Sequence, residues 1–296
     1  MILSMTGFGR GIASSPTKKI TIEIKSLNSK QFDLAMRVPP FFKELEVEAR
    51  NRMGARLERG KVELTATAES IGKETPVTFN TPVLAGYKEQ IEKLAIELGI
   101  PEPADWYNVL LRLPDATKAE STGIDDADRT AFFTAVSLAV IALEEFRTSE
   151  GRKLYSFFVK KIENLATLLS QVDCFEAERV PKIRARIEEQ LTRLDSIEYD
   201  RGRLEQELIF YIEKLDVTEE KTRLRAHLNY FMETLGAPDG ERTPQGQGKK
   251  LGFIAQEIGR EINTLGSKSN NADMQRIVVQ MKDELEQIKE QVLNVL

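Results

Sequence analysis

The sequence has few of the side chains on which several common enzyme chemistries depend. Its 296 residues include one histidine, His227, and one cysteine, Cys174. A single cysteine excludes an intramolecular disulfide framework and a cysteine-based zinc cluster, and it fits a reducing cytoplasm. A single histidine excludes a mechanism that uses two histidines of one chain. Because no GxSxG, P-loop or GxGxxG motif occurs either, serine-nucleophile and nucleotide-fold chemistries have no support.

Long hydrophobic runs and an excess of positive charge are also missing. The longest apolar run, residues 131–143, contains Thr134 and Ser137 and is too short to span a bilayer. The N-terminus lacks a basic segment followed by a long apolar one, so we expect no export signal, no membrane partner and a cytoplasmic location. The net charge of −5 argues against attraction of a polyanion to the whole surface. A polyanion would need a local basic track, for which Arg56 and Lys61 are candidates; their alternative role is a solvated helix face.

The order of the predicted elements favours an α+β fold in three parts. Residues 1–126 alternate as strands near 2–12, 19–27, 31–38 and 61–69, with helices at 42–58 and 82–99, which predicts a mostly antiparallel sheet. Residues 127–200 are helical, and we expect separate helices at 128–150 and 153–172 and a third after Pro181, forming an arm. Residues 201–296 predict a helical C-terminal domain, with a flexible connector at 236–248 and a last helix at 273–293.

Two charged rows in the C-terminal part are the candidate site. If a helix starts near Asp216, then Asp216, Glu220, Arg223 and His227 follow one another at i, i+4, i+7 and i+11. In the segment 250–270, an apolar ridge is opposite a second row made of Glu257, Arg260, Glu261 and Thr264. Two such helices would pack with their charged rows along one groove.

These rows contain the ligand types that a hard divalent cation prefers. The candidate metal ligands are carboxylates and the single imidazole: Asp216, Glu219, Glu220, His227, Glu257 and Glu261. Oxygen ligands suit Mg²⁺ or Mn²⁺, and an imidazole slightly favours Mn²⁺. All of these except Glu219 are also candidate catalytic residues, with His227 as either a ligand or the general acid–base. Arg223 and Arg260 would grip phosphate and Lys268 would steady the strand. The alternatives are ordinary i, i+4 surface pairs and a salt-bridge network at a subunit contact.

Six segments carry a resemblance to a known family. They are SMTGFGRG (4–11), EIKSLNSKQFD (23–33), RGKVEL (59–64), LEQEL (204–208), DVTEEKTRLRAH (216–227) and QEIGREINTLGSKSNNAD (256–273). With these segments the chain resembles the YicC/YloC family over nearly its full length. The resemblance implies an α/β N-terminal domain, a helical C-terminal domain, a ring-like homohexamer, and metal-dependent endoribonuclease activity on single-stranded RNA.

The resemblance leaves other functions open. An RNA-binding adaptor without cleavage activity would use the same cations, and a purely structural oligomer would use the charged rows as subunit contacts. Gly252 and Gly259 depart from the family pattern, in which Asp and Asn are common at these positions. A glycine inside a helix costs about 1 kcal/mol relative to alanine, so both positions require a packing reason.

Overall fold

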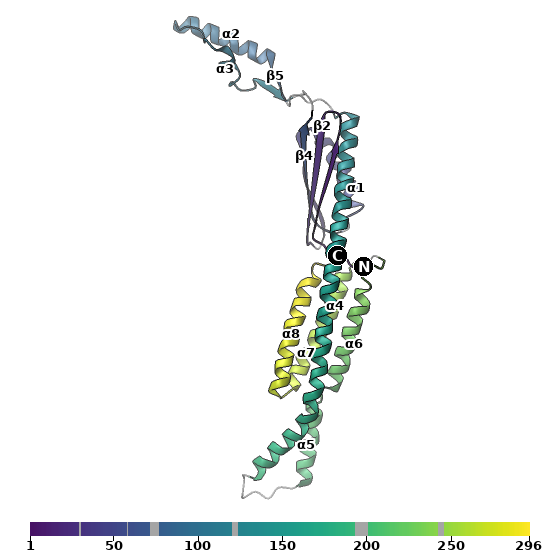
Figure 1. Ribbon diagram of the computed structural model, residues 1–296. Helices are drawn as coiled ribbons and strands as arrows, with labels where there is room; N and C mark the ends of the chain where they lie inside the picture. Colours follow the sequence, from purple (N-terminus) through teal and green to yellow (C-terminus); the bar gives the residue numbers. More distant parts are fainter. Residues whose placement is uncertain (30, 58, 72–76, 120–123, 193–200, 242–245) are drawn as a thin grey trace. The chain divides into compact units, whose positions relative to one another are not determined.

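The chain folds into two compact units. A computed structural model describes residues 1–29, 31–57, 59–71, 77–119, 124–192, 201–241 and 246–296. The sheet unit contains residues 8–25 and 32–143, and the helical unit contains residues 1–7, 26–31 and 144–296. Helix α4 (Asp126–Thr192) contributes residues to both (Figure 1). The division falls inside this helix, whereas the sequence predicts a boundary at residue 126. The α+β class is confirmed.

A four-stranded sheet is the centre of the sheet unit. Its order is β1 (Gly7–Ser14), β2 (Lys18–Leu27), β4 (Gly60–Ser70), β3 (Phe32–Arg37). Thr67 lies opposite Thr21, and Ile71 N–H donates to the Thr17 carbonyl, so β2 and β4 run antiparallel. Strands β3 and β4 are parallel, with Phe32 opposite Gly60. The sheet is therefore mixed, and the parallel pair is the part that the alternation pattern did not predict.

The core of the sheet unit follows from that alternation. Ile20, Ile22 and Ile24 of β2 are fully buried, as one face of an alternating strand should be. They share one cluster with η1 (Pro40–Leu45), α1 (Glu46–Gly54) and the first part of α4, in which the Phe42 and Phe132 rings are 4.9 Å apart. Each fully buried side chain of this size contributes about 1.5–3 kcal/mol.

A smaller part of the sheet unit has little core of its own. Strands β5 (Val77–Phe79) and β6 (Thr117–Ala119) pair antiparallel, next to helices α2 (Thr81–Leu98) and α3 (Trp106–Leu110). The prediction of a helix at 82–99 is confirmed, and Gly99 ends it in the left-handed conformation with φ 63°. Ala95 is the one buried residue of α2, so this helix presents most of its apolar side chains to solvent.

The predicted breaks within the central arm are wrong. Residues 126–192 form one helix, α4, which continues through Gly151 and Pro181. A Cβ atom at Gly151 would lie 2.2 Å from the carbonyl oxygen of Ile2, so this glycine permits a close approach of the N-terminal segment and does not end the helix. Residues 193–200 of the predicted arm lie outside the described residues, as do residues 242–245 of the predicted connector. None of the helices in the described ranges is long and apolar enough to span a membrane.

Four antiparallel helices make the helical unit. They are α4 from residue 144 onward, α6 (Thr218–Leu235), α7 (Gln247–Lys268) and α8 (Ala272–Val292); α5 (Arg201–Leu215) comes between α4 and α6 in the chain. Helix α7 packs against both α6 and α8. The apolar ridge predicted for 251–265 is buried, and Phe158 of α4 meets Phe231 of α6 with ring centroids 5.7 Å apart. A bundle of this kind fixes which face of each helix looks outward.

Glycines of α7 allow α8 to approach closely. A Cβ atom at Gly248 would lie 2.4 Å from the Val295 carbonyl oxygen, and one at Gly266 would lie 3.0 Å from Val278 Cγ1. At Gly259 the corresponding distance, to Leu285 Cδ2, is 3.2 Å, so a larger side chain there would displace Leu285. The departure at Gly259 therefore has a packing reason, whereas Gly252 meets only Val292, at 3.6 Å.

Candidate functional site

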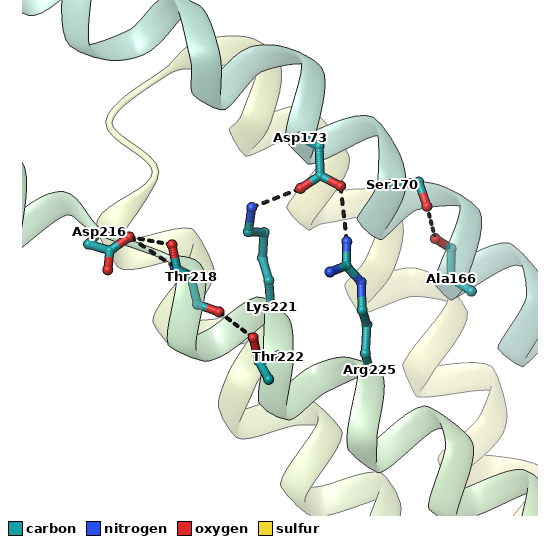
Figure 2. Close-up of polar contacts among 8 residues, drawn as sticks. All are labelled: Ala166, Ser170, Asp173, Asp216, Thr218, Lys221, Thr222 and Arg225. Carbon is teal, nitrogen blue, oxygen red and sulfur yellow. Dashed lines mark hydrogen bonds and ion pairs between the residues drawn. The ribbon is translucent and has the colours of Figure 1, made fainter.

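The start of α6 differs from the sequence prediction. Asp216 lies before the helix, which begins at Thr218, so it does not continue the row of Glu220, Arg223 and His227. Its side chain accepts hydrogen bonds from the Thr218 hydroxyl at 2.7 Å and the Thr218 backbone N–H at 3.1 Å (Figure 2). These bonds, the hydroxyl first, hold the pKa of Asp216 below its usual value. An aspartate two residues before the first helical residue thus satisfies one backbone donor of the first turn, that of Thr218.

An ion-pair cluster joins α6 to α4. Asp173 of α4 accepts from Lys221 Nζ at 2.8 Å and from Arg225 at 3.0 Å, two residues on the same side of α6 (Figure 2). The hydrogen bond from Lys221 is the main reason that the pKa of Asp173 is lowered. Lys221 and Arg225 therefore mark the side of α6 that faces α4.

Three contacts define the face of α6 that meets α7. Glu220 pairs with Lys268 at 2.7 Å, the Lys250 ammonium lies 5.0 Å from the Tyr230 ring centroid, and the Gln247 amide donates to the carbonyl of Thr234. Arg223 and His227 fall between these positions on the same helical row. His227 is half-buried and Arg223 is exposed.

We call the line of contact between α6 and α7 the α6–α7 seam. Several side chains of the matching α7 row are partly buried along it. Glu257, Glu261 and Lys268 are half-buried and follow one another at i, i+4 and i+11, while Arg260 beside them is exposed. Glu220 and Lys268 are in direct contact, and helical geometry predicts that His227 and Arg223 of one row lie on the same side of the helix pair as Glu257 and Glu261 of the other. Asp216 and Glu257 are not brought together: the charge of Lys268 acts on Asp216, and Lys268 lies about 16 Å along α7 from Glu257.

Glu220 is the most unusual carboxylate of the seam. Its side chain is 6% exposed, and the Oε2 atom makes no hydrogen bond although Oε1 pairs with Lys268. A buried carboxylate oxygen without a donor is costly, so Glu220 depends on Lys268 for its charge to be tolerated. Two other acidic candidates are in more exposed pairs, Glu219 with Arg223 and Glu257 with Arg260 at 2.7 Å.

The candidate metal ligands do not form a closed cage within one chain. Among the described residues, no three His, Cys, Asp or Glu side chains gather where one ion could bind all of them. Glu257 and Glu261 lie one helical turn apart on the same face of α7. A pair of this kind suits Mg²⁺, which is commonly held by one or two carboxylates, several waters and substrate phosphates.

The candidate RNA contacts divide between the two units. Arg223, Arg260 and Lys268 lie on the α6–α7 seam of the helical unit, whereas Arg56 and Lys61 belong to the sheet unit and are exposed.

The sequence interpretation omits the cation and aromatic residues at the other end of the seam. They are Tyr230, Lys249, Lys250 and Phe253. The basic pair directly before Phe253 was the available signal in the sequence. The pairing of Lys250 with Tyr230 appears only once the register of α6 on α7 is known.

Comparisons with known proteins cover the whole chain. The family described as "Endoribonuclease YicC-like, N-terminal region" matches residues 2–156, and "Endoribonuclease YicC-like, C-terminal" matches residues 172–296. A protein of Clostridioides difficile named "Probable endoribonuclease YicC" is 30% identical over 299 residues, covering 100% of both chains. A protein of Haemophilus influenzae with the same name is 27% identical over 299 residues, covering 99% of both. The second matched region contains the α6–α7 seam and the first contains the sheet. The chain therefore belongs to the YicC-like endoribonuclease family.

Proposed function

We propose that this protein is a divalent-metal-dependent endoribonuclease of the cytoplasm that cleaves single-stranded RNA at the α6–α7 seam. The family supports RNA cleavage in general. The observation that carries the location is the antiparallel packing of α6 on α7, which aligns the row of His227 with the row of Glu257 and Glu261. Acidic, basic and imidazole side chains from two helices then face one RNA backbone.

His227 is proposed as the general acid–base. Phosphodiester cleavage requires a proton to leave the attacking oxygen and another to reach the leaving oxygen. As the single histidine of the chain, His227 carries the side chain best suited to such transfer near neutral pH. Its half-buried position beside α7 leaves part of the ring accessible to a substrate.

Arg223 and Arg260 are proposed to bind the phosphates around the scissile bond. Both are exposed and paired with a carboxylate of their own helix, Glu219 and Glu257. Exposed pairs of this type are worth about 0–1 kcal/mol, so a phosphate can replace the carboxylate at little cost. A guanidinium then offers two parallel donors to the phosphate.

Glu257 and Glu261 are proposed to hold Mg²⁺ or Mn²⁺. A divalent cation bound there supplies positive charge against the charge that develops on the phosphoryl oxygens. Glu220 is less suited to this role within one chain, since the ammonium of Lys268 already occupies one side of its carboxylate.

A homo-oligomer is proposed as the working form, with the hexamer implied by the family resemblance. The support is the exposed apolar surface of the small α2–α3 part, where Ile96 is 82% and Tyr107 81% exposed. Apolar side chains in such a cluster mark interaction surfaces. Light scattering of the purified protein measures the number of copies, and a monomeric mass would contradict this part.

Cleavage of a labelled single-stranded oligoribonucleotide, with Mn²⁺, Mg²⁺ or a chelator, tests the proposal. We expect cleavage that stops on metal removal, a drop of about 100-fold or more in kcat for His227→Ala, and weaker Mn²⁺ binding by calorimetry for Glu257→Gln and Glu261→Gln. Glu150→Gln is the control, because Glu150 forms a matching i, i+3 pair with Lys153 on α4. Cleavage that persists without metal would refute the metal role, and unchanged activity of all three site variants would refute the site.

The same measurements also test a second function, that of an RNA-binding adaptor. An RNA-binding adaptor without cleavage activity would need no metal cage, and among the described residues no three candidate ligands gather around one point. RNA binding that does not respond to chelator, without cleavage in any metal, would support the adaptor.

A further inference from the structure

Two exposed aromatic rings, each beside a lysine, lie at the end of the α6–α7 seam opposite to Lys268. Tyr230 is 44% exposed and Phe253 is 56% exposed. The Lys250 ammonium is 5.0 Å from the Tyr230 ring centroid, and the Lys249 ammonium is 5.7 Å from that of Phe253. The two adjacent lysines of α7 thus reach one ring on each helix. We call these four residues the aromatic–lysine cluster.

The cluster continues both rows of the proposed site. Tyr230 lies three residues after His227 on α6, and Phe253 lies four residues before Glu257 on α7, so each ring is one turn from a proposed active residue. From Phe253 to Lys268 the seam extends about 22 Å along α7. A short stretch of nucleic acid strand can therefore contact the cluster and the proposed site at once.

The chemistry of the cluster matches an unpaired nucleotide. An exposed aromatic ring offers a flat apolar face on which any nucleobase can stack, and a neighbouring ammonium attracts the phosphate of that nucleotide. Positive charge is concentrated here: Lys249 and Lys250 are adjacent, while Arg260 and Lys268 further along α7 are each paired with a glutamate. In a duplex the base faces are already stacked on one another, so a stacking site distinguishes single strands from duplexes.

We propose that Tyr230 and Phe253 stack on unpaired bases of the RNA while Lys249 and Lys250 contact the adjoining phosphates. This cluster selects single-stranded RNA and holds it in register with His227 and Glu257. The inference rests on the proposed function, since it assigns part of the substrate recognition at the same seam. The rings are positioning residues that act before the chemical step.

The expected effect is on binding. Loss of one stacking ring weakens single-strand binding about 5- to 150-fold. Since neither ring touches the scissile bond, kcat at saturating RNA should change less than about threefold. Tyr230→Phe and Phe253→Tyr keep a ring and should keep the affinity of the unaltered protein. Discrimination against a duplex of the same sequence should fall in Tyr230→Ala and Phe253→Ala.

The experiment uses the full chain and a fluorescein-labelled single-stranded oligoribonucleotide. Fluorescence anisotropy measures Kd in the presence of chelator, and a cleavage assay with Mn²⁺ measures KM and kcat. Tyr211→Ala is the control, because Tyr211 is exposed to a similar extent, 48%, on α5. Circular dichroism and light scattering are recorded for every variant, and the ring-conserving variants separate loss of the ring from loss of the fold.

The outcomes are distinct. If the unaltered protein neither binds nor cleaves RNA, the proposed function fails and this inference with it. If it does both, while Tyr230→Ala and Phe253→Ala bind as tightly as Tyr211→Ala, the stacking role alone is refuted. If the alanine variants instead change the number of copies and leave Kd unchanged, the cluster is a contact between copies and the inference is overturned. Raised Kd and KM with retained kcat, restored by the ring-conserving variants, supports it.

Discussion

Lys268→Met should destabilise the helical unit more than Glu220→Gln, which removes the charge of the carboxylate that pairs with Lys268. Lys268→Met retains the stem and removes the ammonium that pairs with Glu220. Glu220 would then keep a charge in a site that is 6% exposed, where its Oε2 already makes no hydrogen bond. Removal of one partner from a buried pair costs about 3–5 kcal/mol. We expect about 3 kcal/mol, the lower end, because 31% exposure of Lys268 lets water reach the pair.

The reverse substitution should cost less. Glu220→Gln leaves a partly exposed ammonium that water can solvate, so the expected loss is about 1 kcal/mol. In the double variant no buried charge remains, and it should be more stable than Lys268→Met alone. This ordering follows from the unequal exposure of the two side chains, and an exposed pair would not produce it.

Thermal and urea unfolding followed by circular dichroism, without RNA or metal, measure these differences. About 3 kcal/mol corresponds to a fall of roughly 6–12 °C in Tm for a unit of this size. Lys289→Met is the control, since Lys289 is similarly exposed, 36%, but pairs with the exposed Glu286; its expected cost is below about 0.5 kcal/mol. Equal losses for Lys268→Met and Lys289→Met, or a double variant less stable than Lys268→Met, would refute the reasoning.

Three further predictions concern stability. Since the pKa of Asp173 is held below 3.8, mainly by Lys221, its contribution to the free energy of unfolding is present above pH 3.8 and is lost as the pH falls through the lowered value. Asp173→Asn should therefore be less stable than the unaltered protein near about pH 6, and in urea unfolding the difference should shrink as the pH falls below 3.8; a constant difference would contradict this. Gly248→Ala should cost about 1–3 kcal/mol, because its Cβ atom would lie 2.4 Å from the Val295 carbonyl oxygen. Gly86→Ala, in α2 with nothing within 4 Å, should stabilise by about 0.5–1 kcal/mol, and thermal unfolding of both variants decides whether helix packing or propensity controls each position.

Much of the local structure was predictable because it depends on short-range periodicity. The alternation of Ile20, Ile22 and Ile24 predicts one buried face of a strand, and all three are buried. The apolar ridge from Leu251 to Leu265 predicts the buried face of α7, which the structure has. The prediction fails where packing outweighs a local signal. The sequence predicts a break between residues 150 and 153, but α4 continues there, and Gly151 permits the close approach of Ile2.

The candidate site was predictable in its residue types and less so in its arrangement. The single histidine and the two acidic rows are visible as sequence spacing. Asp216 was placed on the helix because spacing alone does not distinguish a residue that caps a helix from one inside it. The register of α6 on α7, set by Glu220–Lys268 and Lys250–Tyr230, has no short-range signature.

The sequence by itself determined the fold class, the secondary structure of most segments, the residue types available for catalysis and the family. Only the tertiary structure decided which faces of α6 and α7 meet, which carboxylate is buried, and which rings remain exposed beside lysines. The physical reason is that propensity and periodicity act over one or two turns of chain, whereas the face that a helix buries depends on partners distant in sequence, such as Phe158 of α4 against Phe231 of α6.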